Sequence, residues 1–346
     1  MPNRDLVVIG GSAGATEPLK AILSRLPPDL RASIVVVLHV PAESTGIYRT
    51  VMKAAGLLAV ETAADRTGLV RGRVYLAPPD RHLLVEDGHL TLGTGPRENL
   101  VRPGIDPLFR SAAASHGPRT IGVILSGMLN DGASGLEAIK RCGGIALVQA
   151  PRQARASEMP LAALEATSVD LSADAEHLAQ AICRYVAEEA PAAPASVPKD
   201  IVLEVQIAAG RKLGSPDVAE IARPVALTCP DCGGVLSEVN GKPLRFRCQV
   251  GHAYTSRTLL RDQEGDVDEA MRVALRIVEE RAELVSRMGR DAGELGRTAT
   301  ADMYSRRATE YRAHADILRQ AVLRSMELTD ADAESEAAQL EAVGPK

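Results

Sequence analysis

Apolar runs of strand length recur through the first half of the chain, separated by polar turns that contain glycine or proline. The runs are rich in Val, Ile and Leu and hardly alternate with polar residues, which is typical of parallel strands buried on both faces. Segments with helical spacing of apolar residues lie between them. We therefore expect a doubly wound α/β domain with a mostly parallel sheet. The predicted strands are 5–10, 33–39, 73–78, 121–127 and 144–150, and the predicted helices lie near 15–25, 106–116, 132–142 and 174–186.

Residues 82–93, "HLLVEDGHLTLG", follow a different pattern. Two short runs alternate between apolar and polar positions on either side of Asp87-Gly88, a dipeptide that favours tight hairpin turns. The pattern predicts a β-hairpin, and we expect it at a sheet edge.

The periodicity disappears at 188–200, where Pro and Ala accumulate. Such a composition is typical of an extended, semi-rigid linker. Within the linker, "IVLEVQIAAG" fits either a strand or a short helix, and the pattern leaves that choice open. We expect a first domain at 1–187, a linker at 188–227, a small cysteine-containing module at 228–258, a helical hairpin at 262–330 and a disordered tail at 331–346.

Composition excludes several classes of protein. The 346 residues are 45% hydrophobic, enough for buried cores, and carry a net charge of -5 with dispersed Lys and Arg, which argues against a nucleic-acid partner. The chain shows neither a signal peptide nor an apolar run of membrane-spanning length, so we expect no membrane insertion and a cytoplasmic location. Five cysteines, three of them close together, favour a reducing compartment and a metal over disulfides.

The first turn contains a candidate nucleophile. Gly10-Gly11-Ser12-Ala13-Gly14 fits the G-x-S-x-G elbow, which lifts a serine hydroxyl above the carboxyl edge of a sheet. A glycine turn that serves close packing or binds a phosphate is the alternative. The dinucleotide form of that alternative is disfavoured, because the G-x-G-x-x-G spacing is absent and the second strand ends in His39 rather than an acidic residue.

Two further residues follow other predicted strands. His39 ends the second strand, and Asp131 follows the fourth in a glycine-bracketed loop. Each has a simpler interpretation: His39 as a structural histidine, and Asp131 as the cap of the helix that begins at Gly132. Because carboxyl ends of parallel strands meet at one edge, Ser12, His39 and Asp131 together predict a nucleophile, a base and an orienting acid.

The chain from about residue 4 to 186 resembles the catalytic domain of the CheB family of chemotaxis protein-glutamate methylesterases. The resemblance rests on "IGGSAGATEPLKAIL", "VVVLHVP", "VYLAPPDRHL", "RPGIDPLFRSAA", "GVILSGMLNDGASGL" and "ALVQ" followed by "ASEMP", in that order. It implies a serine hydrolase that removes methyl groups from glutamate γ-esters of chemoreceptors or related signalling proteins, and that also deamidates glutamine in some members. No cofactor is implied for catalysis.

The resemblance also assigns roles to residues. It places the nucleophile at Ser12, the base at His39, the orienting acid at Asp131 and an oxyanion donor at Met128. We expect a second donor at Ala13, where the following helix starts. His82 and Arg102 lie in family motifs, and we expect them to line the cleft, with a structural role for His82 as the alternative.

The chain departs from the family pattern in its motifs and in its domain composition. The family's Gly-Met-Gly loop reads Gly127-Met128-Leu129 here, and its Gln-His-Met strand end reads Leu38-His39-Val40. Many members also carry a receiver domain before the catalytic domain, for which this sequence has no room. We therefore expect regulation by another protein or by the residues after 187.

The cysteine-containing module has a metal-binding pattern. Cys229, Cys232, Cys248 and His252 are spaced C-x2-C-x15-C-x3-H, which predicts a zinc ribbon. Four protein ligands leave no open position, so the zinc would be structural. Free thiols with a solvent-exposed histidine are the alternative. Cys142 and Cys183 lie in helical patterns, and we expect them in the core.

Two long helical patterns follow the module. Their apolar stripes predict a helical hairpin, either solvated or forming a coiled coil that allows homodimerisation. The stripes consist of Met271, Ala274, Val278, Ala282, Val285 and Met288, and of Ala301, Tyr304, Ala308, Tyr311, Ala315, Leu318 and Val322. An alternative to the enzyme is an adaptor with weak activity, whose zinc and helical regions recruit a signalling partner such as a methyltransferase or a kinase.

Overall fold

The computed structural model describes residues 2–40, 45–194, 196–211 and 215–342. Within it the chain forms two compact units, Met1–Leu259 and Leu260–Lys346. The first unit contains every strand of the described residues and all the predicted site residues. Among the described residues, no helix combines the length and the apolar character that a bilayer span requires.

A seven-stranded parallel sheet forms the centre of the first unit. Its strand order is β10-β9-β8-β1-β2-β5-β3: from β1 the chain passes to β2, to the edge strand β3 and back to β5, and it later crosses to the other side to add β8, β9 and β10 in turn. All five predicted strands are confirmed, and two short strands, β3 and β10, were not predicted. The strands are β1 (Leu6–Gly11), β2 (Ser33–Leu38), β3 (Ala59–Thr62), β5 (Arg73–Leu76), β8 (Thr120–Ile124), β9 (Ile145–Gln149) and β10 (Leu171–Ala173).

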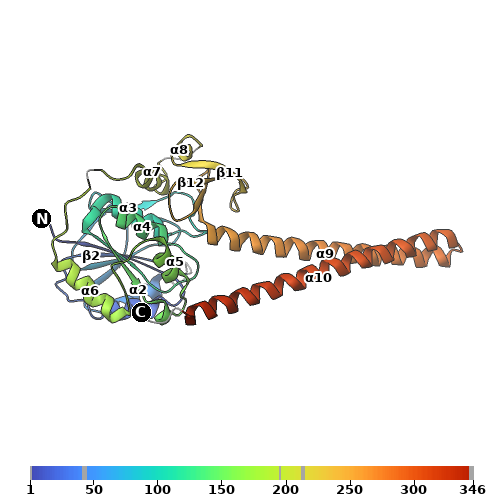
Figure 1. The fold of residues 1–346 in the computed structure, drawn as a ribbon, viewed down its shortest axis with the longest axis horizontal. Coiled ribbons are helices and arrows are strands. Elements are labelled where there is room, and N and C mark those ends of the chain that lie inside the picture. The colour runs from blue at the N-terminus through green and yellow to red at the C-terminus, as the bar shows by residue number, and fades with distance from the viewer. Residues whose placement is uncertain (1, 41–44, 195, 212–214, 343–346) are drawn as a thin grey trace. The chain divides into compact units, whose positions relative to one another are not determined.

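Helices cover both faces of this sheet (Figure 1). Val7 and Ile9 pack in one apolar cluster, while Leu6 and Val8 pack in the other, as the alternation of side chains along a strand requires. The predicted doubly wound α/β fold is therefore confirmed. The first face carries α1 (Thr16–Leu23), α2 (Thr45–Ala55) and α6 (Ala175–Ala187), and the second carries α3 (Ile105–His116), α4 (Ala133–Arg141) and α5 (Glu158–Ala166).

The predicted hairpin is present, but its expected place at a sheet edge is wrong. β6 (His82–Glu86) and β7 (His89–Gly93) pair antiparallel around Asp87-Gly88 and join β4 (Thr67–Gly68) in a separate three-stranded sheet. The apolar side chains of the hairpin pack in the same cluster as α3. Burial of its apolar face against a helix thus takes the place of hydrogen bonding to the large sheet.

The segment expected to be a linker is folded and belongs to the first unit. "IVLEVQIAAG" lies in a helix, α7 (Lys199–Ala208), followed by α8 (Ser215–Ala219). Ile201 packs in the cluster of α3, and Leu203 and Ile207 form a cluster with Val218. A four-stranded antiparallel sheet follows, which we call the cysteine module (residues 222–255). Its strands are β11 (Ala222–Thr228), β12 (Val235–Val239), β13 (Arg245–Cys248) and β14 (Ala253–Thr255).

The second unit is helical, as predicted. α9 (Ser256–Glu294) begins at the end of the first unit, and α10 (Thr298–Ala342) lies beside it (Figure 1). Ala282, Ala308 and Ala315 are buried in the thin seam between them, and all three belong to the predicted stripes. α10 continues to Ala342, within the segment predicted as a tail (331–346), and residues 343–346 lie outside the described residues.

Candidate active site

Ser12 lies in the turn between the first strand and the first helix. β1 ends at Gly11 and α1 begins at Thr16, so the serine stands at the carboxyl edge of the parallel sheet. The turn depends on Gly14, whose φ of +77° lies in the left-handed region that side chains disfavour. Ser12 is half-buried. The local geometry therefore fits the predicted strand-to-helix elbow.

His39 directly follows β2, the strand next to β1, and lies level with Ser12 along the edge of the sheet. Gly11 of β1 pairs in register with Leu38 of β2, and the His39 amide donates to the Gly11 carbonyl at 3.1 Å. Adjacent strands lie about 4.8 Å apart. Ser12 and His39 thus follow neighbouring strands at the same register position.

Asp131 approaches from the other side of β1. It lies in the loop between β8 and α4 and is 3% exposed. Its Oδ2 accepts from the Ile105 amide at 2.6 Å and its Oδ1 accepts from the Asp106 amide at 3.2 Å. These amides form the first turn of α3, so the carboxylate binds the amino-terminal end of α3. The alternative role as a cap of α4 is not seen, because the Gly135 amide in the first turn of α4 donates to Asp106 Oδ1 at 2.6 Å and not to Asp131.

The structure joins His39 to Asp131 by a hydrogen bond. The distance from His39 Nε2 to Asp131 Oδ2 is 3.0 Å. Burial alone would raise the pKa of Asp131, but the bonds from His39 and from the Ile105 amide hold it below its usual range. Among the described residues, no hydrogen bond joins Ser12 Oγ to His39; Nδ1 is the ring nitrogen left to face a serine.

Two polar residues beside Asp131 were missed as site residues. Asn99 Nδ2 donates to Asp131 Oδ1 at 3.0 Å and to Asp106 Oδ2 at 3.2 Å. Burial raises the pKa of the Asp106 carboxyl, and the charge of Asp131 raises it further. The position of Asp106 in a family motif was its only sequence signal, and Asn99 had none.

The loop after β8 provides backbone donors near Ser12. The Ser12 amide donates to the Ser126 carbonyl at 2.9 Å, which holds this loop against the serine turn. Leu129 has a φ of 62°, in the left-handed region, and its amide donates to Glu158 Oε2 at 2.7 Å. Among the described residues, the amides of Ala13 and Met128 have no acceptor.

This backbone geometry accounts for the family's glycine at the position of Leu129. A left-handed conformation costs about 1–2 kcal/mol for a residue with a side chain. Leu129 adopts this unfavourable conformation, and the hydrogen bond from its amide to Glu158 helps to hold it there. The loop therefore keeps the conformation that a glycine would adopt without strain.

A pocket opens beside His39. Its volume is about 260 Å³, and it is lined by Leu38, His39, Val40, Asp80, Arg97, Leu100, Val101, Arg102 and Pro103. Arg102 donates from Nη2 to Asp80 Oδ1 at 2.6 Å and from Nη1 to the Gly95 carbonyl at 2.9 Å. Arg102 thus lies on the wall of this pocket.

His82 has a different environment. It is fully buried, with Nε2 donating to the Pro96 carbonyl at 2.8 Å and Nδ1 accepting from the Gly104 amide at 3.2 Å. Both ring nitrogens are therefore used within the protein. The structure supports the alternative structural role of His82 and places no part of it on the pocket wall.

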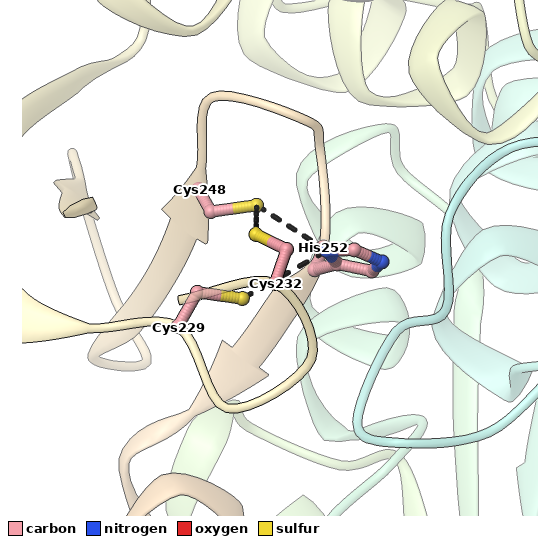
Figure 2. Close-up of side chains that lie close together, drawn as sticks. All are labelled: Cys229, Cys232, Cys248 and His252. Carbon is pink, nitrogen blue, oxygen red and sulfur yellow. Dashed lines mark hydrogen bonds between the residues drawn. The ribbon is translucent and has the colours of Figure 1, made fainter. Parts of the chain in front are cut away.

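Cys229, Cys232, Cys248 and His252 lie together at one end of the cysteine module (Figure 2). All four ligand atoms lie within 4.8 Å of one another. The Sγ atoms of Cys232 and Cys248 are 3.7 Å apart, and His252 Nδ1 is 3.4 Å from Cys248 Sγ and 3.8 Å from Cys229 Sγ. The three sulfurs are thiols, not disulfide-bonded. Of the two remaining cysteines, Cys142 is buried, as expected, and Cys183 is partly buried against the core.

Comparisons with known proteins match the first half of the chain. The CheB methylesterase family model matches residues 7–182. A provisionally named protein-glutamate methylesterase/protein-glutamine glutaminase of Leptospira interrogans is 40% identical over 183 residues, which are 53% of this chain and 95% of that protein. The protein-glutamate methylesterase/protein-glutamine glutaminase 1 of Oleidesulfovibrio alaskensis is 38% identical over 189 residues, 54% of this chain and 51% of that one.

A solved structure agrees with these matches. The crystal structure of the Thermotoga maritima CheB methylesterase catalytic domain is 31% identical, with a TM-score of 0.50, and the alignment covers 52% of this chain and 97% of that one. The family match includes Ser12, His39 and Asp131, whereas the cysteine module follows its last residue. With half of its length matched by the family model, the chain belongs to the CheB methylesterase family.

Proposed function

We propose that the protein is a protein-glutamate methylesterase that uses Ser12, His39 and Asp131. The observation that carries the proposal is the buried hydrogen bond between His39 and Asp131, beside Ser12 at the edge where β2, β1 and β8 end. Relatives that match this region are named protein-glutamate methylesterase/protein-glutamine glutaminase.

In the proposed mechanism, Ser12 Oγ attacks the carbonyl carbon of a glutamate γ-methyl ester while His39 Nδ1 takes the hydroxyl proton. Asp131 holds the ring in the required tautomer and stabilises its charged form. The tetrahedral intermediate expels methanol, which receives the proton from His39. Water, deprotonated by His39, then attacks the acyl-enzyme and releases glutamate and free Ser12.

The amides of Ala13 and Met128 are the proposed oxyanion donors. Both belong to the two turns that the Ser12–Ser126 hydrogen bond holds together, and neither has another acceptor among the described residues. Loss of one such donor from a site closed to water costs about 3 kcal/mol of transition-state stabilisation. The constrained backbone of Leu129, next to Met128, would help to fix this donor.

Glutamine deamidation is proposed as a second activity. The same serine attacks the side-chain amide, and ammonia leaves in place of methanol. For the substrate we propose the methylated cytoplasmic helices of chemoreceptors or a similar methylated protein. Arg97 and Arg102 in the pocket beside His39 would suit an acidic surface of such a partner. A cognate methyltransferase remains a predicted partner, and homodimerisation through the helices remains a prediction.

We further propose that the Cys₃His cluster binds a structural zinc ion. A tetrahedral zinc with bonds of about 2.3 Å to sulfur places two sulfurs about 3.8 Å apart. The distances of 3.7, 3.4 and 3.8 Å within the cluster are close to the edges of such a tetrahedron. Cys229, Cys232, Cys248 and His252 would fill all four positions, so the ion would stabilise the module and take no part in the hydrolysis.

The methylesterase proposal is tested with receptor membranes carrying radiolabelled methyl esters. The wild-type protein should release labelled methanol, and Ser12→Ala should reduce the rate by at least about 1,000-fold because the nucleophile is lost. Ser24→Ala, an exposed serine at the end of α1, is the matched control and should keep the wild-type rate. Absence of methanol release from the wild-type protein would contradict the proposal.

A further inference from the structure

We propose that Asn99 positions the carboxylate of Asp131 and that the cysteine module holds Asn99 in place. The proposal rests on the proposed function, because it takes Asp131 as part of the catalytic machinery. It goes beyond that function, since the module follows the family match, which ends at residue 182. Turnover would then depend on the folding of a module that contributes no residue to the reaction.

Asn99 bridges two buried carboxyl groups. It is 5% exposed, and its Nδ2 group donates one hydrogen bond to Asp131 Oδ1 at 3.0 Å and one to Asp106 Oδ2 at 3.2 Å. A side-chain amide has two N–H donors, so both are used here. Asn99 therefore restrains the oxygen of Asp131 that His39 does not contact.

The cysteine module determines which way the Asn99 amide faces. The Thr255 backbone amide donates to the side-chain oxygen Asn99 Oδ1 at 3.0 Å. The backbone amide of Asn99 donates to the Ala253 carbonyl at 2.7 Å. A backbone N–H can only donate, so it requires the oxygen of Asn99 on its side. The opposite orientation would place that oxygen against two carboxyl groups. Thr255 thus selects the orientation that supports Asp131.

Thr255 also holds the residue that precedes Asp131 in the chain. Its hydroxyl donates to Asn130 Oδ1, and the Thr258 hydroxyl donates to the same oxygen at 3.1 Å. Asn130 and both threonines are buried. Thr255 therefore supports Asp131 in two ways. It contacts Asn99, which donates to Asp131, and it contacts Asn130, which precedes Asp131 in the chain.

The backbone around Asn99 needs this external support. Asn99 and Leu100 have φ values of 52° and 67°, both in the left-handed region. Such conformations are unfavourable by about 1–3 kcal/mol and persist when the surrounding structure enforces them. Leu100 packs against the apolar cluster that contains Cys229 and Cys248. Without a folded module, this segment would lose the contacts that maintain its conformation.

Buried ion pairs attach the same segment to the module. Glu98 precedes Asn99 and accepts a hydrogen bond from Arg247 of β13 at 3.1 Å and another from Arg110 of α3. Glu98 and Arg247 are at most 1% exposed. Arg247 lies next to Cys248 in the chain. The contact between the module and the active-site segment thus adjoins the metal-binding end.

The proposal is tested by kinetics of the full chain with zinc bound. Asn99→Ala should lower kcat by up to about 100-fold, because Asp131 loses a restraint on its position. KM should stay within about two-fold, since Asn99 is not on the pocket wall. The pH profile of kcat should also change, because Asp131 loses a hydrogen bond that helps to lower its pKa.

The module's contribution is tested separately with Thr255. Thr255→Val removes the hydroxyl contact to Asn130 and should lower kcat several-fold, whereas Thr255→Ser keeps the hydroxyl and should restore it. Asn240→Ala alters an exposed turn of the module and serves as the matched control. Removal of zinc by a chelator should lower kcat at least as much as Asn99→Ala.

A substrate-independent measurement separates failure of this proposal from failure of the proposed function. The proton between His39 and Asp131 should give a low-field NMR resonance that is absent in His39→Gln and shifted in Asn99→Ala. An unchanged resonance together with wild-type kcat and pH profile in Asn99→Ala would overturn the positioning role. Absence of methanol release from the wild-type protein, with the resonance still sensitive to Asn99, would instead overturn the proposed function.

Discussion

The two larger sheets of the first unit are stabilised in different ways. The seven-stranded sheet lies between two large apolar clusters, and most of its Val, Ile and Leu side chains are fully buried. The cysteine module contributes to two small clusters. In one, Ala222 and Val239 pack with residues of α7. In the other, Cys229, Leu236, Phe246, Cys248 and Tyr254 pack with Leu259, and two of these are proposed metal ligands. The parallel sheet thus depends on apolar burial, whereas the proposed zinc ion would supply much of the stability of the module.

Buried charged groups are a second difference between the parallel sheet and the cysteine module. Five ionisable side chains are buried where the module meets α3 and α7, and they are Glu98, Arg110, Glu204, Arg245 and Arg247. Such an interface is sensitive to the loss of any partner, because an unpaired charge is left away from water. The comparison teaches that within one compact unit the catalytic sheet should tolerate changes that unfold the module.

The largest expected effect comes from a metal ligand. Cys248→Ser should abolish tight zinc binding and unfold the cysteine module, because a structural zinc contributes about 10–16 kcal/mol in small modules. The parallel sheet should stay folded. Metal analysis, circular dichroism and limited proteolysis would measure this, with new cleavage expected between residues 222 and 255.

Cys183→Ser is the matched control for that experiment, because Cys183 is a partly buried thiol on the parallel-sheet side. It should leave the zinc content unchanged. Equal loss of the parallel sheet in Cys248→Ser would break the comparison, since the two regions would then unfold together. Full protection of 222–255 from proteolysis without metal would contradict the role of zinc.

The next largest effect concerns the buried charges. Glu204 accepts two hydrogen bonds from Arg245 at 2.8 Å and one from Arg247 at 3.0 Å. Glu204→Gln should destabilise the contact between α7 and the module by about 3–5 kcal/mol, because two arginines lose part of their counter-charge. Denaturant unfolding would measure the loss, with the exposed Glu238→Gln as the control.

The same cluster gives a pH dependence. Burial would raise the pKa of Glu204, but Arg110, Arg245 and Arg247 lower it well below its usual range. Its stabilising contribution is therefore present above the ordinary glutamate pKa of about 4.3 and is lost as the pH falls through the folded-state value. Glu204→Gln should lack this component, and an unchanged acid limb of the stability curve would contradict it.

The sequence was sufficient to predict which residues share an edge of the sheet, because that depends only on which strands they follow. Ser12, His39 and Asp131 each follow a buried apolar run, and parallel strands bring such ends to one edge of the sheet. The hydrogen bond between His39 and Asp131 is a consequence of that arrangement. The sequence could not predict the rotamer of Ser12, which depends on local contacts in the turn.

The sequence failed where contacts between distant segments decide the structure. Asn99 is held by Thr255, 156 positions away, and no local pattern marks such a pair. "IVLEVQIAAG" fitted both helix and strand because its apolar residues are nearly continuous, and packing against α3 favours the helix. No sequence signal marked Glu204, the acidic residue of this segment, which pairs with arginines of the module.

The smallest expected effect is a pH dependence of stability that arises in the parallel-sheet region and not in the cysteine module. His116 ends α3 on the side of the parallel sheet, where burial and the nearby Arg119 lower its pKa to about 4. Between pH 6.5 and 4 the unfolded chain therefore binds a proton that the folded chain does not, so stability falls as the pH decreases. His116→Gln removes this loss and should make the free energy of unfolding less pH-dependent by about 2 kcal/mol over that range. Urea unfolding at several pH values would measure the difference, with the exposed His89→Gln as the control. Zinc release from the module should follow the same pH course in His116→Gln and in the wild-type protein, because His116 belongs to the parallel-sheet region; a shift in zinc release would show that the two regions are coupled through α3.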